Sequence, residues 1–335
     1  MKYEHIICDQ ITEDGYPIYN DLLKKQTQLP HKVLNHTHFV NGSICEYKGI
    51  TLYAYRTQQE PQFIHTLCHL TVLKNGKLPM GEQFTFKPRP PCSDSELLNY
   101  KMIVKSNPTY DLWRAEDPRL VVHEDSLYMF FTTGWKMGYC KIDLMFEGSE
   151  IVSCIFNPAI YPDPPDVNFD GYDGREKNWS PVSYEGELWV LYACQPNICF
   201  YRLSDGRILY AKAPLVDTWK YGNIKGGTPL MKMDNGNYLT IFHSTMRVDG
   251  GAYIYTAGAM VFNPDLHLIG ISKHPLIAPN LTQDKRSYLQ DVAVVFPAGL
   301  VRKENKWLVS CGINDWHTRI FTITDSTLNK NITYN

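Results

Sequence analysis

The chain has 335 residues, 44% of them hydrophobic and 13% aromatic, and its formal net charge at pH 7 is −2. This length suits two domains or one large all-β domain. The balanced charge excludes a general attraction to nucleic acid or to an anionic membrane surface, and we expect neither as a partner.

The cysteines predict a reducing compartment. Nine are scattered along the chain without any C-x-x-C spacing, so neither a zinc site nor a disulfide framework is indicated. The first residues, "MKYEHIICDQITEDG", include acidic residues before the apolar region of a signal peptide could form, so no signal peptide is predicted. No apolar run approaches the about 18 residues of a membrane span. We therefore expect a cytoplasmic protein.

The predicted elements are mostly strands. One short helix is expected over residues 19–29, "YNDLLKKQTQL". Short, aromatic-rich apolar runs typical of strands follow at residues 50–56, 127–133, 188–194, 238–242 and 307–312. Between strands, Asn75-Gly76, Asp205-Gly206 and Asn235-Gly236 are dipeptides that adopt the positive φ angles of tight hairpins. The chain is therefore predicted to be antiparallel β.

A repeated pattern organises these strands. Each of four units has a residue before proline, an apolar strand, a charged or glycine-containing turn, and a second strand that opens on an aromatic residue. They begin near residues 117, 180, 228 and 296, and their aromatic residues are Tyr128, Trp189, Tyr238 and Trp307. A degenerate unit, "NGSICEYKGITLYAYR", precedes them from residue 41.

Five such units predict an all-β fold, a five-bladed β-propeller forming a single domain over residues 1–335, with residues 1–40 as an extension that packs on it. A β-sandwich of hairpins is the alternative, but it does not explain the recurring proline at the first strand of each unit. Proline lacks the N–H of a central strand and belongs at a strand's first residue. In a propeller these strand starts face one shared site.

Converging strand starts would assemble a mixed site. They bring Asp117 and Phe296 toward Arg56, the segment "REKNW" (175–179) and the segment "GGT" (226–228). The ends of the second strands add Gln195, His243 and Asp315. One carboxylate, flanking cations and the aromatic rings of Trp179, Phe296 and Trp316 suit the apolar faces and hydroxyl rim of a sugar. We therefore expect a carbohydrate site.

Three segments in this order resemble one known family. They are "EDPRL", "GGTPLMKMDNGNYLTIFHS" and "VVFPAGLV…CGIND". The chain from residue 41 to about Thr318 resembles the inverting β-mannoside phosphorylases of glycoside hydrolase family 130 and the related β-1,2-mannosyltransferases. The resemblance implies a five-bladed propeller that acts on mannose-containing oligosaccharides, with mannose 1-phosphate as product or donor. Homo-oligomers are common in the family.

The resemblance also implies residue roles. Asp117 is the general acid, and inorganic phosphate attacks the anomeric carbon from the opposite face. The phosphate-binding positions correspond to Lys177, Gln195 and His243, where Lys177 lacks the guanidinium fork and Gln195 departs from the family, while Arg175 is a substitute cation. Sugar-binding roles fall on Arg56 and Asp315, with Phe296 and Trp316 as the apolar wall. The remaining substrate-binding set is Glu116, Arg119, Asn178 and Trp179.

Structural interpretations stay open for several of these residues. Asp117 could simply pair with Arg114 or Arg119, His243 could be a core histidine, and Trp179 and Trp316 could be core residues. The Asp-rich loop "YPDPPDVNFDGYDG" lacks the residue order of a calcium loop. His65, His69 and His123 have no metal-binding spacing. We therefore expect no metal and no cofactor beyond phosphate or a sugar phosphate as co-substrate.

Two other functions remain. One is an inverting β-mannoside hydrolase, which needs a second carboxylate to activate water, and the aligned positions carry none. The other is a sugar-binding propeller without catalysis. A transferase that uses a nucleotide sugar is compatible with the departures at Lys177 and Gln195.

Overall fold

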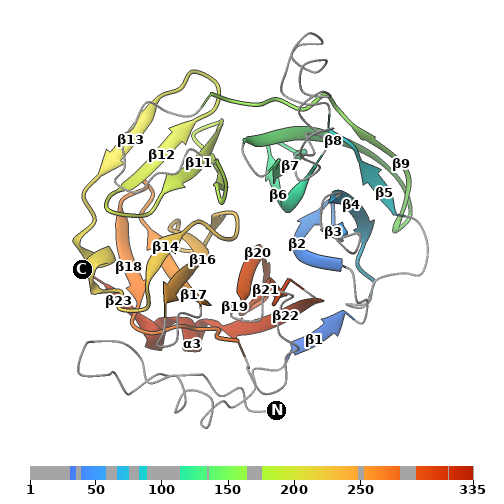
Figure 1. Cartoon of the computed structure of the whole chain (residues 1–335). Helices are drawn as coiled ribbons and strands as arrows, with labels where there is room; N and C mark the ends of the chain where they lie inside the picture. Colours follow the sequence, from blue (N-terminus) through green and yellow to red (C-terminus); the bar gives the residue numbers. More distant parts are fainter. Residues whose placement is uncertain are drawn as a thin grey trace, which may run out of the picture.

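Five sheets, antiparallel except for one short parallel pair, surround a common centre in the computed structural model (Figure 1). The structure describes residues 31–34, 39–57, 66–74, 83–88, 114–133, 136–163, 176–247, 253–279, 292–315 and 317–334. The predicted helix at 19–29 and the turn Asn75-Gly76 lie outside these residues. The prediction of an all-β, five-bladed propeller is confirmed, and the β-sandwich alternative is excluded.

Four blades have four strands each. Blade 1 contains β2 (Phe39–Tyr47), β3 (Ile50–Thr57), β4 (Leu67–Val72) and β5 (Phe84–Phe86). Blade 2 contains β6 (Glu116–His123), β7 (Ser126–Thr132), β8 (Met137–Glu147) and β9 (Glu150–Phe156). Blade 3 contains β10 (Ser180–Tyr184), β11 (Glu187–Ala193), β12 (Ile198–Arg202) and β13 (Ile208–Ala211). Blade 5 contains β20 (Val295–Lys303), β21 (Lys306–Ile313), β22 (His317–Thr324) and β1 (His31–Leu34).

Blade 4 is larger. Its main path runs β14 (Asn223–Lys225), β16 (Tyr238–Arg247), β17 (Tyr253–Phe262), β18 (Leu268–Ser272) and β23 (Ile332–Tyr334). Two short strands join it, β15 (Met231–Lys232) on β16 and β19 (Val292–Ala293) on β17. The 3₁₀ helix η1 (Pro214–Thr218) precedes β14.

Strands from both ends of the chain complete the outer edges of two blades. The early strand β1 pairs with β22, so residues 31–34 belong to blade 5. The late strand β23 pairs with β18 of blade 4. Between β22 and β23 lies α3 (Asp325–Asn331), a helix that the sequence patterns did not predict, whose N-cap Thr324 accepts a hydrogen bond from Thr327 N. These outer strands join sequence-distant parts of the ring and cover edges that would otherwise be unpaired.

The hairpin turns follow from local conformational preference. Lys48-Gly49, Glu124-Asp125 and Glu185-Gly186 have positive φ at both residues, which is the geometry of two-residue hairpins. At the two predicted turns that the structure describes, Gly206 and Gly236 also have positive φ. Each turn leads into the second strand of a hairpin or, for Gly206, into the outermost strand of blade 3. The repeated hairpin pattern in the sequence is thus local turn chemistry.

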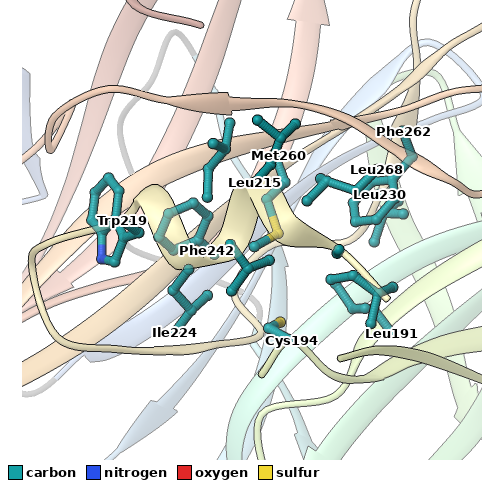
Figure 2. Packing of buried hydrophobic residues seen from close by; sticks show 14 of the residues in the cluster. Leu191, Cys194, Leu215, Trp219, Ile224, Leu230, Phe242, Met260, Phe262 and Leu268 are labelled. Carbon is teal, nitrogen blue, oxygen red and sulfur yellow. The ribbon is translucent and has the colours of Figure 1, made fainter. Parts of the chain in front are cut away.

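The core lies between neighbouring blades. Figure 2 shows the cluster that joins blades 3 and 4, where Leu191 and Cys194 meet Phe242, Met260 and other side chains from blade 4 and η1. The repeat aromatics Trp189 and Trp307 are nearly fully buried. Truncating a buried aromatic ring of this kind costs about 3–5 kcal/mol. Packing between blades therefore fixes the positions of the inner strands.

A β-bulge re-aims the start of the inner strand in blades 1 and 2. The strand register shifts between Val40 and Ser43 in β2, and it shifts again between Glu116 and Arg119 in β6. In each bulge one residue has positive φ, namely Asn41 at 51° and Asp117 at 52°. The residue after it is Gly42 in one blade and Pro118 in the other. Bulges commonly redirect a side chain, and here they turn two equivalent side chains toward each other.

Candidate active site

Asp117 belongs to a hydrogen-bonded group at the inner ends of blades 1, 2 and 5, which we call the carboxylate network (Asn41, Arg56, Glu116, Asp117 and Asp315). Asn41 Nδ2 donates to Asp117 Oδ1 at 2.8 Å and to Asp315 Oδ1 at 3.1 Å. Arg56 Nη2 donates to Asp315 Oδ1 at 2.8 Å, and its Nη1 lies 3.4 Å from Asp117 Oδ1. The structure therefore brings together Arg56, Asp117 and Asp315 as predicted.

The two adjacent carboxylates have different environments. Glu116 Oε1 accepts hydrogen bonds from Thr66 Oγ1 at 3.2 Å and from the Arg114 guanidinium, and its Oε2 lies 3.4 Å from Arg56 Nη1. By contrast, Asp117 Oδ2 accepts no hydrogen bond from the described residues, and the Asp117 side chain is 16% exposed. Both Glu116 carboxylate oxygens are thus occupied by contacts with Thr66 and the two arginines, whereas Asp117 Oδ2 is available to a ligand.

The surroundings of Asp117 favour its ionised form. Burial alone would raise its pKa, but the positive charge of Arg56, the Asn41 hydrogen bond, and the more distant Arg119 and Lys177 outweigh burial, so the pKa is lowered. Opposite charges and hydrogen bonds to the charged form both have this effect. Without substrate, Asp117 is therefore a carboxylate at neutral pH.

Arg119 lies behind Asp117 and links blade 2 to blade 4. Its side chain is fully buried, its Nε donates to the Gly227 carbonyl at 2.5 Å, and its guanidinium lies 5.4 Å from the centre of the Phe296 ring. Burial lowers its pKa to about 10, and the Asp117 charge opposes that shift. Arg119 therefore carries charge at neutral pH as a buried cation, its Nη1 and Nη2 have no hydrogen-bond partner among the described residues, and its contact with a sugar stays a prediction.

The Phe296 side chain, expected to form an apolar wall of the sugar site, is less exposed than that role would suggest. The ring is 6% exposed and lies 4.9 Å from the His243 ring, with the Arg119 guanidinium also against it. Its faces are thus used in internal packing. Trp316, the other predicted wall residue, lies outside the described residues.

Blades 3 and 4 meet at an unusually close backbone contact. A Cβ on Gly226 would lie 2.0 Å from the Asn178 carbonyl oxygen, and one on Gly227 would lie 2.0 Å from the Ile241 carbonyl oxygen. Gly227 N also donates to Ser180 Oγ at 2.8 Å. Only glycine permits this approach. The "GGT" segment is therefore fixed next to Asn178, as the convergence of strand starts predicted.

Two exposed lysines flank this contact. Lys177 immediately precedes Asn178, and Lys225 immediately precedes Gly226. The charge of Lys177 lowers the pKa of Asp117, and the charge of Lys225 contributes to lowering that of His243. We call Lys177, Lys225 and the backbone contact between Asn178 and Gly226 the lysine side. Its two ammonium groups are suited to an anion that approaches Asp117.

His243 differs from the expected phosphate ligand. It is 1% exposed and stacks on Tyr255, with ring centres 6.0 Å apart. Burial, with the charges of Arg119 and Lys225, lowers its pKa to about 3, although a hydrogen bond to the Gly226 backbone opposes the shift. The imidazole is therefore neutral at physiological pH and supplies no positive charge. It supports the glycine segment from behind.

Other predicted residues have structural roles. The Trp179 indole is 1% exposed and donates to Glu176 Oε2 at 2.9 Å, so the structure places it in the core, and its contact with a substrate stays a prediction. Gln195 Oε1 accepts a hydrogen bond from Ile224 N at 2.6 Å and thereby anchors β14. Asn178 is 8% exposed with φ of 65°. Arg175 lies outside the described residues.

Two site residues were missed by sequence reasoning. Asn41 occupies in blade 1 the place that Asp117 occupies in blade 2, and "NG" in place of "DP" was the available signal. Lys225 directly precedes the "GGT" segment, and its only signal was this adjacency. Aligning the first unit with the second at these dipeptides would have found Asn41, whereas no comparison of the units points to Lys225.

Among the described residues, no group of three or more His, Cys, Asp or Glu side chains could hold a metal ion. Within those same residues, no helix is long and apolar enough to cross a membrane.

The sequence profile described as beta-1,4-mannooligosaccharide phosphorylase, that of glycoside hydrolase family 130, matches residues 20–332. The chain belongs to glycoside hydrolase family 130. The matched range includes every strand from β2 to β22, so the family assignment and the propeller cover the same part of this family 130 protein. No curated protein matches it.

Solved structures with the same fold include proteins with different activities. A mannose phosphorylase from Leishmania mexicana, solved with a phosphate ion, has 14% identity and a TM-score of 0.51, covering 91% of this chain and 92% of its own. A GDP-Man-dependent mannosyltransferase from the same organism has 11% identity and a TM-score of 0.54, with the same coverage. A structure from work on family 130 hydrolases of β-1,2-mannosidic linkages in Candida mannan has 13% identity and a TM-score of 0.56, covering 87% and 85%. At these identities the likeness shows the fold.

Proposed function

We propose that this family 130 protein transfers β-mannosyl groups between a mannose-containing oligosaccharide and phosphate, with inversion at the anomeric carbon. The observation that supports it most is the asymmetry of Asp117. One carboxylate oxygen is held by Asn41 and Arg56, and the other accepts no hydrogen bond from the described residues. Exposed Lys177 lies close enough to influence the Asp117 charge. An acid–base group and an anion site thus lie side by side.

In phosphorolysis, a phosphate oxygen forms a bond to the anomeric carbon while the bond from that carbon to the glycosidic oxygen breaks. The leaving oxygen takes up the electron pair and receives a proton from Asp117, directly or through a mannose hydroxyl. The products are mannose 1-phosphate and an oligosaccharide shorter by one mannose. In the synthetic direction, the Asp117 carboxylate takes the proton of the acceptor hydroxyl as phosphate leaves.

The charge state of the free site suits the synthetic direction. An ionised Asp117 is already the base that accepts the acceptor's proton. Phosphorolysis instead needs Asp117 protonated, and an anion bound at Lys177 would offset the positive charge that lowers the Asp117 pKa. Sugar-phosphate donors therefore meet a site that is ready for them, and oligosaccharide breakdown is coupled to phosphate binding.

The lysine side supports phosphate, or the phosphate of a sugar donor, as the partner of this reaction. Its two ammonium groups neutralise an attacking anion and hold it in place. A hydrolase would need a carboxylate base there. Glu176, next to Lys177, is 5% exposed and already accepts hydrogen bonds from Trp179 Nε1 and the Tyr192 hydroxyl, both at 2.9 Å. Its carboxylate is therefore committed to the core.

We extend the proposal to its co-substrates and location. Phosphate or a sugar phosphate is a co-substrate, and the reaction as written requires no further cofactor. Sugar phosphates are typical of the cytoplasm, which is where we place the enzyme.

The test is to incubate the purified protein with mannose 1-phosphate and mannose or short mannosides. We expect phosphate release in step with chain growth. Parallel reactions contain GDP-mannose as donor, or β-mannoside in the presence and absence of phosphate. Equal release of mannose with and without phosphate would overturn the proposal in favour of a hydrolase. Saturable sugar binding without turnover in any reaction would indicate a binding protein.

A further inference from the structure

Asn41 occupies the most constrained position in the carboxylate network. Its side chain is almost fully buried, and both hydrogens of its amide nitrogen are used, one on Asp117 Oδ1 and one on Asp315 Oδ1. We propose that Asn41 is a positioning residue that holds these two carboxylates together and keeps Asp117 ready to accept a proton. This inference rests on the proposed function.

The orientation of the amide follows from its partners. A flipped amide would place Oδ1 against two carboxylate oxygens, which can only accept hydrogen bonds. In the observed orientation Asn41 Oδ1 is buried and has no hydrogen-bond partner among the described residues. Leaving a buried acceptor unpaired is costly. The cost is explained if the two donated hydrogen bonds serve the reaction.

The backbone is shaped to present this amide. Asn41 has φ of 51°, a conformation that asparagine tolerates better than most residues. Across from it, a Cβ on Gly312 would lie 1.7 Å from Asn41 Oδ1 and 3.0 Å from Asn41 Cα. Any larger residue at position 312 would displace the amide. The bulge in β2 and the glycine in β21 are therefore two independent parts of one arrangement.

Asn41 acts among several charges, and its contribution differs from theirs. Arg56 also contacts Asp117 and Asp315, but it is shared with Glu116. The titratable and charged groups that interact with Asp117 from the surrounding elements are Arg56 on β3, Cys68 on β4, Arg119 on β6, Lys177 before β10 and His243 on β16. Glu116 on β6 and Asp315 after β21 are connected to it through the shared partners Arg56 and Asn41. Among the described residues, Asn41 is the neutral group that donates a hydrogen bond to Asp117.

Removing the amide should therefore move the pH dependence of catalysis. The ionised Asp117 would lose a hydrogen bond and face Asp315 without the intervening donor, and both changes favour protonation. In the synthetic direction, where Asp117 must be ionised, the acidic limb of the pH profile should move to higher pH. In phosphorolysis, where Asp117 must be protonated, the alkaline limb should move the same way.

The experiment measures kcat/KM against pH in both directions for the wild type, Asn41→Gly and Asn41→Asp. Glycine removes the amide and keeps the positive φ, and we expect both limbs to move up by about one pH unit. Aspartate keeps the shape but adds a fourth carboxylate to the network, and we expect a larger shift. Asn305→Gly, in the exposed turn at the far end of β20, is the matched control and should leave both limbs in place.

Gly312→Ala is an independent variant, because it displaces Asn41 without altering it, and it should shift the limbs in the same direction. Lower activity with unmoved limbs in all folded variants would overturn the inference and leave Asn41 a packing residue. Unchanged activity would overturn it as well. Both results differ from failure of the proposed function, in which the wild type itself shows no mannosyl transfer in either direction.

Discussion

The carboxylate network and the lysine side face the same centre but are built differently. In the network, Asn41, Arg56 and Asp315 are tied to one another and to Asp117 by short contacts from three blades. On the lysine side the backbone is tightly packed while the Lys177 and Lys225 side chains remain exposed. A proton-transfer group needs fixed geometry, whereas an anion that comes from solvent needs cations that are exposed to it. In the proposed reaction, this difference would separate the proton transfer at the sugar from the binding of the phosphate.

The largest expected effect is on the network side. Asp117→Asn keeps the shape of the side chain but removes its acid–base function, so turnover should fall about 10³-fold in both directions. Asp205→Asn, at an exposed position, is the matched control and should retain full activity. Phosphate release and thermal unfolding should be measured together. Retained turnover in a folded Asp117→Asn variant would mean that another acid does the chemistry.

On the lysine side, the double variant Lys177→Ala/Lys225→Ala should raise KM for phosphate or mannose 1-phosphate by about 10- to 100-fold, because two charge-assisted contacts are lost. KM for the oligosaccharide should change little. Lys141→Ala, at another exposed lysine, serves as the control. If the oligosaccharide KM rose instead, the division of the site into two halves would be wrong.

The buried His243 imidazole, which lies next to the lysine side, is neutral at physiological pH. Its folded pKa of about 3 lies below the ordinary value of 6.5, so its contribution to stability is present above pH 6.5 and is lost as the pH falls. Between pH 7 and pH 5 this amounts to about 2 kcal/mol of unfolding free energy. Urea unfolding should show that His243→Gln lacks this part of the loss, while the exposed-site variant His267→Gln keeps it. Equal losses in all three proteins would contradict a buried neutral imidazole.

The smallest effect is expected at Gln195. Gln195→Ala removes the hydrogen bond to Ile224 N, next to Lys225. A single lost hydrogen bond of about 1 kcal/mol would loosen β14 and raise KM for phosphate about fivefold. Initial rates at varied phosphate concentration test this. A loss as large as that of the lysine double variant would instead make Gln195 a direct phosphate ligand.

Much of the fold could be predicted because it follows from local patterns. The positions of Tyr128, Trp189, Tyr238 and Trp307 marked the second strand of each unit, and the structure places each in such a strand. The helix α3 was missed because its seven residues, "DSTLNKN", have no apolar periodicity and depend on the Thr324 cap. The pairing of β1 and β23 with the outer strands of blades 5 and 4 could not be predicted from local residue patterns either, because their partner strands are remote in sequence.

The sequence by itself determined the repeat, the hairpins and the identity of Asp117 as the residue at an inner strand start. The tertiary structure alone decided which neighbours Asp117 has and which of the predicted residues are accessible. Trp179 and His243 fit a sugar or phosphate site by residue type, yet packing between blades buries both. Asn41 and Lys225 had no strong motif, yet a bulge places Asn41 against Asp117, and Lys225 directly precedes the tight glycine contact. Accessibility and charge state depend on long-range packing, which residue patterns do not encode.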